Sequence, residues 1–545
     1  MDRFAALLDR LSLTPQRNTK LALLVDHFRS SPDPERGLAL AALTGSLEFK
    51  GAKAGAIRAL AAERVDPILF ELSYDYVGDL AETVALIWPS QPGPNRAPDL
   101  AEVVEGLTTT SRADAPALLT GWLDALDANG RWALLKLVTG GLRIGVSARL
   151  AKTALAQYGE VDVTEIEELW HGLKPPYEDL FAWLEGRADK PVSTAKSPFR
   201  PVMLAHPVQD DALALLDPAD FAAEWKWDGV RIQAVSEGGV RRLYTRTGDD
   251  ISHTFPDVLA ALEFDGAIDG ELLVRGADGE PAPFADLQKR LNRKTVSKAI
   301  LAKHPAFIRA YDLLVDGAND LRAQPFEDRR AQLETVVDAA PDRIDLSEMI
   351  EITSWDKLDA LRRDPAHRLA EGVMIKRRDS VYTPGRPKGL WWKWKRDPFL
   401  IDAVLLYAQR GHGKRSSFYS DFTFGVWRQG DDGDNLVPVG KAYFGFTDQE
   451  LKQLDKFVRD NTIERFGPVR SVTANAETGL VLEIAFEGLQ RSPRHKSGVA
   501  MRFPRIHRIR WDKPSADADR LETLEALLKS RFDASEWRCY SSRYP

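Results

Sequence analysis

The stretch Glu224–Gln233, EWKWDGVRIQ, decides the fold of the middle of this chain. Asp228 and Gly229 predict a tight turn, and runs rich in apolar residues lie on both sides of it. This pattern predicts two β-strands and places Lys226 at the edge of a sheet. A lysine at such an edge is usually an ordinary surface residue, and Lys-x-Asp-Gly alone is too short a pattern to identify a function.

The alternative interpretation makes Lys226 a nucleophile. A free lysine has a pKa of about 10.4, so its amine must lose a proton before it can attack. Nearby cations disfavour the ammonium form, and we expect Arg231, Lys393 and Lys395 to lower the pKa in this way.

Working outward from this stretch, the chain changes its pattern twice. Residues 1–190 carry apolar side chains at helical spacing and predict an all-α domain, followed by a Pro-, Ser- and Lys-rich linker at 191–201. Residues 202–398 mix short alternating runs with helical stretches and predict an α+β domain. Residues 399–545 predict a small β-barrel of the OB-fold type with one helix and a polar tail.

Length and composition fit a multidomain globular protein. A chain of 545 residues is too long for one core, and its hydrophobic fraction of 44% and charged fraction of 28% are ordinary. No apolar run is long enough to span a bilayer, and the first residues read as an amphipathic helix, so we expect a cytoplasmic monomer without a membrane partner. The single cysteine, Cys539, excludes an internal disulfide framework and a Cys-rich zinc site.

The net charge of -7 does not indicate a polyanionic partner, but the basic residues are unevenly distributed. Basic stretches that start at Arg386, Arg410 and Arg491 alternate with Trp, Phe and His in the C-terminal third. One such run is usually a solvated face; several of them, interleaved with aromatics, favour a nucleic-acid track.

Several charged and aromatic residues follow Lys226 in short strand-like motifs. Taken singly, each is explained as a solvated strand residue, a turn acid or a core aromatic. Their common order makes coincidence a poor explanation. They are Arg246 in TRTGDD, Glu271 in DGEL, Tyr311 in AYDLL, Glu371 and Lys376 in EGVMIK, and Lys393 and Lys395 in WWKWK.

With these motifs the chain resembles the covalent nucleotidyltransferase superfamily of ATP-dependent DNA ligases, RNA ligases and mRNA capping enzymes. It is most similar to the multidomain bacterial and archaeal DNA ligases, because SYDYVGDLAET from Ser73 and GGLRIGVSARLAKTALAQ from Gly140 resemble their helical DNA-binding domain. RFPRIHRIRWDK from Arg502 resembles the end of their OB-fold domain.

The resemblance implies sealing of 3'-OH/5'-phosphate nicks in duplex DNA during repair, replication or recombination. Lys226 would attack the α-phosphate of ATP, AMP would move to the 5'-phosphate, and the 3'-hydroxyl would displace AMP. Glu371, together with Glu271, would hold Mg²⁺, with Mn²⁺ as the alternative. The implied ATP-binding residues are Glu224, Arg231, Arg246, Glu271, Tyr311, Arg386, Lys393 and Lys395.

Two further sets of residues come from the flanking domains. The C-terminal motif, Arg510, Asp512 and Lys513, would orient the pyrophosphate leaving group. DNA contacts are expected from Arg143, Arg149 and Lys152, beside glycines that let the backbone approach phosphate. Those glycines, Gly140, Gly141 and Gly145, could equally serve only to end and pack helices.

The chain departs from the family pattern at a few positions. Tyr311 stands where Phe is commoner, Trp394 replaces an aliphatic residue, and Arg386 is assigned beside Pro387, which disturbs the local alignment. NAD-dependent ligases carry a four-cysteine zinc module that one cysteine cannot build, so ATP is the expected cofactor. An RNA ligase or GTP-using capping enzyme, and an inactive DNA clamp, remain as alternatives.

Overall fold

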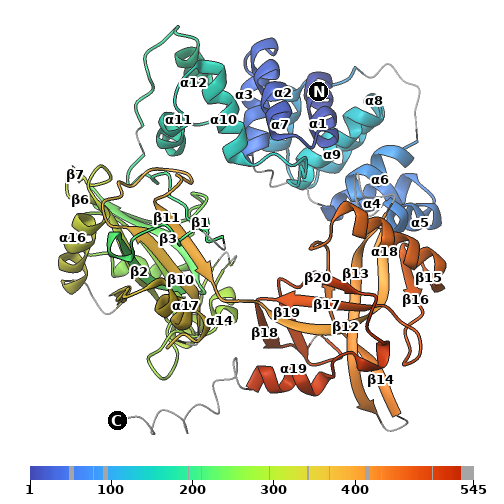
Figure 1. Ribbon diagram of the computed structural model, residues 1–545. Coiled ribbons are helices and arrows are strands. Elements are labelled where there is room, and N and C mark those ends of the chain that lie inside the picture. Colours follow the sequence, from blue (N-terminus) through green and yellow to red (C-terminus); the bar gives the residue numbers. More distant parts are fainter. Residues whose placement is uncertain are drawn as a thin grey trace. The chain divides into compact units, whose positions relative to one another are not determined.

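The computed structural model describes residues 1–47, 49, 54–77, 79–89, 96–193, 195–209, 212–291, 293, 295–339, 343–367, 369–410, 418–430, 433–493 and 495–529 (Figure 1). The chain divides into two compact units. The first comprises Met1–Glu160, Pro175–Glu185 and Pro398–Pro545, and the second comprises Val161–Lys174 and Gly186–Asp397.

The N-terminal part is helical, as its periodicity predicts. In the first helix Phe4, Leu7, Leu8 and Leu11 are buried, which confirms the predicted amphipathic face. Many of the helices begin at an Asp or Ser whose side chain accepts a backbone N–H of the first turn, as Asp127 does. The helices are α1 (Asp2–Leu13), α2 (Arg17–Ser30), α3 (Glu35–Thr44), α4 (Ala54–Arg64), α5 (Pro67–Val77), α6 (Leu80–Ile87), α7 (Leu100–Thr109), α8 (Ala115–Ala125), α9 (Ala128–Thr139), α10 (Ala148–Gly159), α11 (Val163–Leu169) and α12 (Glu178–Leu184).

The second unit contains two mainly antiparallel sheets with helices around them. One sheet has the order β1-β11-β10-β2-β9 and the other β4-β3-β5-β6-β7, with β8 paired to β6. The strands are β1 (His206–Pro207), β2 (Phe221–Trp227), β3 (Val230–Glu237), β4 (Val240–Thr245), β5 (Gly266–Val274), β6 (Ala306–Asp316), β7 (Asn319–Asp320), β8 (Ile344–Leu346), β9 (Met349–Ile350), β10 (Ala370–Arg377) and β11 (Trp391–Lys395). The helices are α13 (Pro256–Ala260), α14 (Phe284–Gln288), α15 (Lys298–Lys303), α16 (Phe326–Asp338) and α17 (Trp355–Arg363).

The predicted turn after Lys226 carries the chain from one sheet to the other. Strand β2 belongs to the first sheet and β3 to the second, and only Asp228 and Gly229 separate them. A Cβ on Gly229 would lie 2.5 Å from the carbonyl oxygen of Leu272, so only glycine fits where the sheets meet. The sequence EWKWDGVRIQ therefore fixes Lys226 at the junction of the two sheets.

Helix α11 packs with the second unit although it is predicted as part of the helical domain. The His171 ring lies 5.2 Å from that of Tyr244, and Arg322 forms an ion pair with Glu168 at 2.8 Å. The segment Val161–Lys174 is thus attached to the sheets by aromatic and ionic contacts.

The C-terminal part is rich in β-structure. Its main sheet has the order β14-β13-β12-β16-β15, with β17 joining β12 to β20, and β18 and β19 form a separate pair. The elements are β12 (Phe399–Arg410), β13 (Tyr419–Gly430), β14 (Gly433–Ala442), α18 (Asp448–Asp460), β15 (Thr462–Phe466), β16 (Val469–Val472), β17 (Val481–Phe486), β18 (Gly488–Arg491), β19 (Val499–Arg502), β20 (Arg505–Arg510) and α19 (Leu521–Leu527). The predicted helix is confirmed as α18, which begins with a capping box of Thr447 and Glu450.

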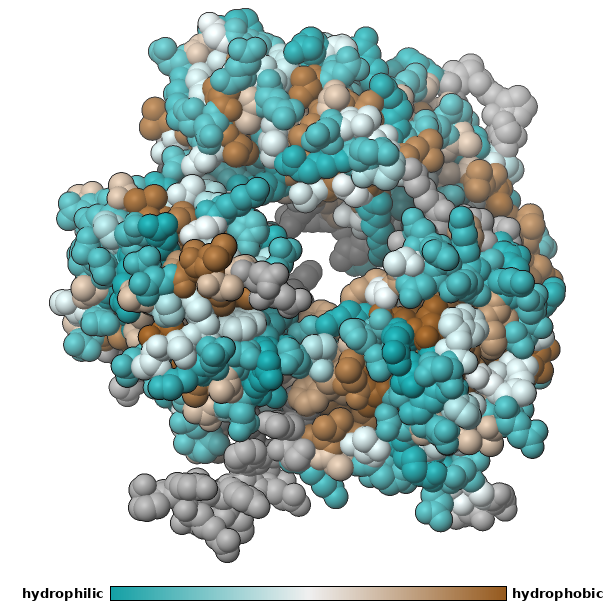
Figure 2. Space-filling model, in the orientation of Figure 1, coloured by the Kyte–Doolittle hydropathy of each residue, from teal (hydrophilic) through white to brown (hydrophobic). Residues whose placement is uncertain are grey.

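Some predicted features cannot be placed. Most of the basic stretch after Arg410, one arginine of the stretch after Arg491, and Cys539 lie outside the described residues. Within the described ranges, none of the helices combines the length and apolarity that a membrane crossing needs. Hydrophilic side chains predominate on the face in Figure 2, with apolar side chains in smaller groups between them.

Candidate active site

Lys226 lies near the end of β2, where the neighbouring strand β10 supplies an acid. Its Nζ donates a hydrogen bond to Oε2 of Glu371 at 2.8 Å, and about a fifth of the lysine side chain (22%) remains exposed. The register of β2 and β10 shifts between Ala370 and Val373, beside Glu371. Lys226 is therefore held in one position while its amine stays accessible.

The prediction that cations lower the pKa of Lys226 is wrong for this structure. Burial does work to lower it, but the carboxylates of Glu371 and Glu271 outweigh burial, and the pKa is raised from its usual value. Of the cations named, Lys395 lies 3.9 Å from Glu371, so it shares that acid. The lysine is stored as an ammonium ion.

The two acids differ in charge state. Burial raises the pKa of Glu271 to about 7, against the opposing effects of Lys226 and Arg231. For Glu371, burial is outweighed by Lys226 and by Lys395, and its pKa is lowered. Asp228 lies close enough to act on both acids. Glu371 is thus the ionised acid of the pair and Glu271 titrates near neutrality.

Cations also gather around Lys226 and Lys393. Lys393, on β11, has its pKa lowered by burial and then by Arg386, Lys226, Lys395 and Arg246. In the described part of the chain no acid forms an ion pair with Lys393. Uncompensated positive charge of this kind favours a phosphate or another anion. The structure thus brings together most of the cations that the sequence predicts.

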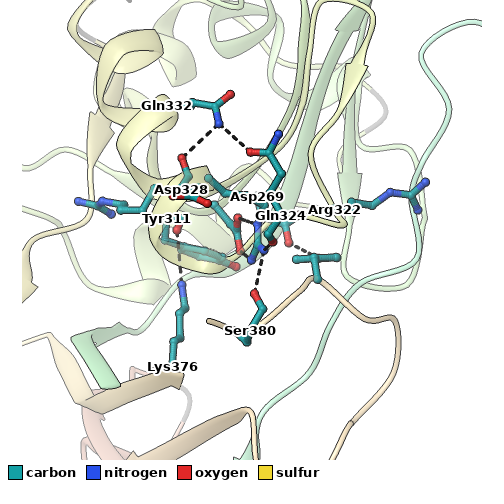
Figure 3. A network of polar contacts seen from close by, with 12 residues as sticks. Asp269, Tyr311, Arg322, Gln324, Asp328, Gln332, Lys376 and Ser380 are labelled. Carbon is teal, nitrogen blue, oxygen red and sulfur yellow. Dashed lines mark hydrogen bonds and ion pairs between the residues drawn. The ribbon is translucent and has the colours of Figure 1, made fainter. Parts of the chain in front are cut away.

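A further acid, Glu224, lies two residues before Lys226 on β2. Glu224 is almost completely buried, and Nζ of Lys376 donates to its Oε2 at 3.2 Å. Burial raises the pKa of Glu224 against the effect of Lys376. Lys376 Nζ also lies 4.6 Å from the centre of the Tyr311 ring. Figure 3 shows Lys376 pointing at the backbone carbonyl of Tyr311, to which it donates at 3.4 Å.

Arg231 is engaged away from the amine of Lys226. Its guanidinium donates to Asp269 at 2.6 Å, to Tyr382 at 3.1 Å and to the carbonyl of Met203 at 2.6 Å. Asp269 is fully buried beside Tyr311 in the contact network of Figure 3. Arg231 and Asp269 therefore form a buried ion pair next to Tyr311.

The C-terminal motif residues form their own ion pairs. Arg510 pairs with Asp512 at 2.9 Å and with Asp402 at 3.2 Å. Lys513 Nζ lies 2.7 Å from the same oxygen of Asp402, on β12. Both cations of the motif therefore share Asp402 as a partner.

The predicted DNA contacts lie in the segment after α9 and on the first turns of α10. Gly140 ends α9 in the left-handed conformation, and the carbonyl of Gly145 accepts from the buried Lys20. These two glycines therefore have structural roles of the kind that the alternative interpretation requires. Arg143 is exposed with a φ of 50°, while Arg149 and Lys152 lie on α10.

The carboxylates around Lys226 suit a metal that is bound partly by substrate. Among the described residues no three acids, histidines or cysteines form a metal-binding group. Mg²⁺ is typically held by one or two carboxylates together with phosphate oxygens and water. Glu371 and Glu271 fit that donor set.

Sequence reasoning missed several residues of the site. Asp228 was assigned only to the turn, and neither Asp269 nor Arg330 was proposed for the site. Arg330 lies on α16, and in the sequence it resembles any charged residue on the solvent-facing side of a helix. Only the structure brings it to within 3.6 Å of Glu224.

Comparison with known proteins gives consistent matches along the chain. Residues 202–395 match the family described as "ATP dependent DNA ligase domain", and residues 415–513 match the "ATP dependent DNA ligase C terminal region". A "Probable DNA ligase" of Koribacter versatilis is 34% identical over 427 residues, which cover 73% of this chain and 72% of that protein. A "Probable DNA ligase" of Anaeromyxobacter dehalogenans is 30% identical and covers 95% of this chain and 97% of its own length.

A solved structure extends the likeness of the fold. The protein named "Pmar-Lig_PreS3" superposes with a TM-score of 0.58 at 15% sequence identity, covering 93% of this chain and 99% of its own. At that identity the likeness concerns the fold alone.

Proposed function

The chain belongs to the family of ATP-dependent DNA ligases, which seal nicks through an adenylate intermediate, and we propose that Lys226 carries the adenylate. The observation that supports this assignment most strongly is the position of Lys226 between two kinds of charge. Glu371 contacts its amine on one side, and Lys393 supplies uncompensated positive charge nearby. Such a site can hold a triphosphate against a lysine that is kept in place by an acid.

In the first step the Lys226 amine attacks the α-phosphorus of ATP. A P–N bond forms, the bond to the pyrophosphate oxygen breaks, and pyrophosphate leaves. Glu371 accepts a hydrogen bond from the ammonium and orients it, and the ammonium loses its proton to solvent before the attack. In the second step a 5'-phosphate oxygen takes the AMP from the lysine, and in the third step the 3'-hydroxyl displaces AMP.

The remaining residues would bind and orient the nucleotide. Lys393 and Lys395 would neutralise the α-phosphate, and a developing charge of this kind is stabilised best by fixed cations. Tyr311 would stack on the purine and Glu224 would flank it. Ribose and phosphate would be bound by Arg246, Arg386 and Arg231. Arg231 would either leave Asp269 to make this contact or act indirectly, by keeping its ion pair with Asp269 beside Tyr311.

A bound Mg²⁺ would neutralise phosphate charge, and Glu371 with Glu271 would hold it. Mn²⁺ offers the same oxygen coordination. The burial of Glu271 fits this role, because a cation would replace the proton that Glu271 otherwise retains near neutral pH.

The wider assignments follow from family membership. We propose a helical DNA-binding domain at 1–190, a linker at 191–201, an adenylation domain at 202–398 and an OB-fold domain at 399–545. Nicked duplex DNA is the proposed partner, a monomer the proposed state and the nucleoid the proposed place of action. Repair, replication and recombination all supply such nicks.

One experiment tests the proposed function directly. The protein is incubated with Mg²⁺ and ATP labelled at the α-phosphate, with unlabelled ATP, GTP and NAD as competitors in parallel. We expect a protein-bound, acid-labile label that ATP alone competes away and that nicked DNA discharges. A label that GTP displaces would favour a capping enzyme, and the absence of any label would favour an inactive clamp.

The charge state of Lys226 predicts a pH dependence. Its pKa is raised from 10.5, so the free amine is scarce at neutral pH and increases as the pH rises. Single-turnover adenylylation is expected to accelerate about tenfold per pH unit between about pH 6 and 8, without a plateau. Quenched-flow measurements with labelled ATP give this profile.

Glu371→Gln removes the carboxylate that most raises the pKa of Lys226. The rate will be lower, because the same acid is proposed to hold the metal, but the profile should bend at a lower pH. Asp379→Asn, an exposed acid of the same unit paired with Arg377, is the matched control and should keep the wild-type profile. A wild-type rate of adenylylation that did not change with pH across the measured range would contradict the conclusion that Lys226 rests as an ammonium ion.

The C-terminal motif predicts a separation of steps. Lys513→Ala should slow self-adenylylation by about 10²-fold and sealing of a pre-adenylylated nick by less than about tenfold, since only the first step releases pyrophosphate. The two rates are measured separately with labelled ATP and with a pre-adenylylated nick. Equal losses in both assays would show that Lys513 does not act on the leaving group.

A further inference from the structure

Arg330, on α16, is a buried cation that faces Glu224, the acid proposed to flank the purine. Its Nη2 donates to the carbonyl of Ser347 at 2.6 Å, and its Nε donates to Glu334 at 3.1 Å. Nη1 has no hydrogen-bond partner among the described residues and lies 3.6 Å from Oε1 of Glu224. Only about 6% of Arg330 is exposed. Two nitrogens of the guanidinium, Nη2 and Nε, are thus held by hydrogen bonds, and the third, Nη1, faces Glu224.

A pocket lies directly behind this contact. Its volume is about 370 Å³, and its lining includes Ala222, Met349 and Arg330. Ala222 lies two residues before Glu224 on the same face of β2, and Met349 pairs with Glu224 across β2 and β9. Glu224 thus has neighbours on β2 and β9 that line the pocket, and so does Arg330, one of its ion-pair partners.

The second cation beside Glu224 approaches from another direction. Lys376, on β10, contacts both oxygens of the carboxylate, at 3.4 and 3.2 Å. A carboxylate that loses one of two flanking cations in a buried site either takes up a proton or turns away. Without Arg330, Lys376 would be the one cation left in an ion pair with Glu224 among the described residues.

We propose that Arg330 is a positioning residue for purine selectivity, which holds the Glu224 carboxylate ionised and directed at the 6-amino group of adenine. This inference rests on the proposed function, in which Glu224 flanks the purine. An ionised carboxylate only accepts hydrogen bonds, and the 6-amino group is the only N–H donor of adenine once N9 carries the ribose. A protonated glutamic acid offers an O–H donor beside its acceptor, and a carboxylate that has turned away no longer reaches the 6-amino group, so both weaken the discrimination.

The experiment compares ATP with purine riboside triphosphate, which lacks the 6-amino group, in single-turnover adenylylation of the full-length chain. Wild type is expected to prefer ATP by about 10- to 100-fold in kcat/KM, the value of one hydrogen bond to a charged group. Arg330→Met should lower kcat/KM for ATP by about the same factor, change the value for the analogue little, and bring their ratio below about threefold.

Two further variants separate positioning from general damage. Arg330→Lys keeps a cation near Glu224 and should restore most of the discrimination. Asp328→Asn is the matched control, because it removes an exposed acid from the first turn of the same helix, and it should keep the wild-type ratio. Equal losses with ATP and with the analogue in Arg330→Met would overturn the proposal, since a merely structural role moves both alike.

Glu224→Met, which leaves no acceptor for the 6-amino group, distinguishes this inference from the function on which it rests. If Glu224→Met abolishes the discrimination and Arg330→Met does not, the role of Arg330 is refuted and the assignment of Glu224 to the purine stands. If Glu224→Met leaves the ratio unchanged, the assignment of Glu224 itself fails. In both cases labelling of Lys226 by ATP in the wild type reports separately on the ligase function.

Discussion

Lys226→Ala is expected to lose self-adenylylation by more than about 10³-fold, because Lys226 is the amine that Glu371 holds at 2.8 Å, whereas Lys395 lies 3.9 Å from that acid. The P–N bond needs a nitrogen that can lose its proton, and methyl offers none. Nick sealing with ATP should disappear together with the label. The measurement is the amount of acid-labile label on the protein after incubation with α-labelled ATP and Mg²⁺.

Three comparisons make this expectation specific. Lys226→Arg should be equally inactive, because a guanidinium stays protonated at the pH of the assay. Lys395→Ala, which leaves the nucleophile in place, should retain a slower but measurable labelling rate. Both inactive variants should still seal a pre-adenylylated nick to some extent, since the adenylate has already been made. Wild-type labelling of Lys226→Ala would move the nucleophile to another residue.

The sequence predicted the strands of the site because their signals are local. Alternating runs on both sides of Asp228 and Gly229 could be read as β2 and β3, and the structure confirms both strands. The need for glycine at position 229 has a further, spatial cause, because the backbone of Leu272 lies too close for a side chain. The sequence alone does not reveal this closeness.

The electrostatics of the site could not be predicted in the same way. The pKa of Lys226 depends on which charges lie nearest, and the sequence suggested the cations. The structure instead places Glu371 at 2.8 Å, because β10 pairs with β2 from 145 residues away. Arg330 was missed for the same reason, since its distance to Glu224 depends on how α16 packs against the sheets.

Removal of the N-terminal helices is expected to separate the two activities of the proposed ligase. A chain that begins at Gly186 keeps all the residues around Lys226, so labelling with ATP should stay within about threefold of the wild-type rate. Its affinity for nicked duplex should fall by on the order of 10²- to 10³-fold, with a weaker dependence on salt, because fewer phosphate contacts release fewer counterions. A companion chain that begins at Val161 retains the contacts of Glu168 and His171, and tests whether those contacts stabilise the second unit.

A full-length variant shows whether charge is responsible. Changing Arg143, Arg149 and Lys152 together to Ala should reduce the slope of log affinity against log salt by about one for each phosphate that these side chains neutralise in the wild type. Labelling with ATP should remain at the wild-type rate, since the helical region contains none of the site around Lys226. Binding is measured by fluorescence anisotropy on a nicked duplex across a salt series. If both the truncated chain and the triple variant bound nicks with the wild-type affinity and salt slope, the helices would not be a DNA clamp. The affinity for duplex DNA would then have to come from the remaining residues.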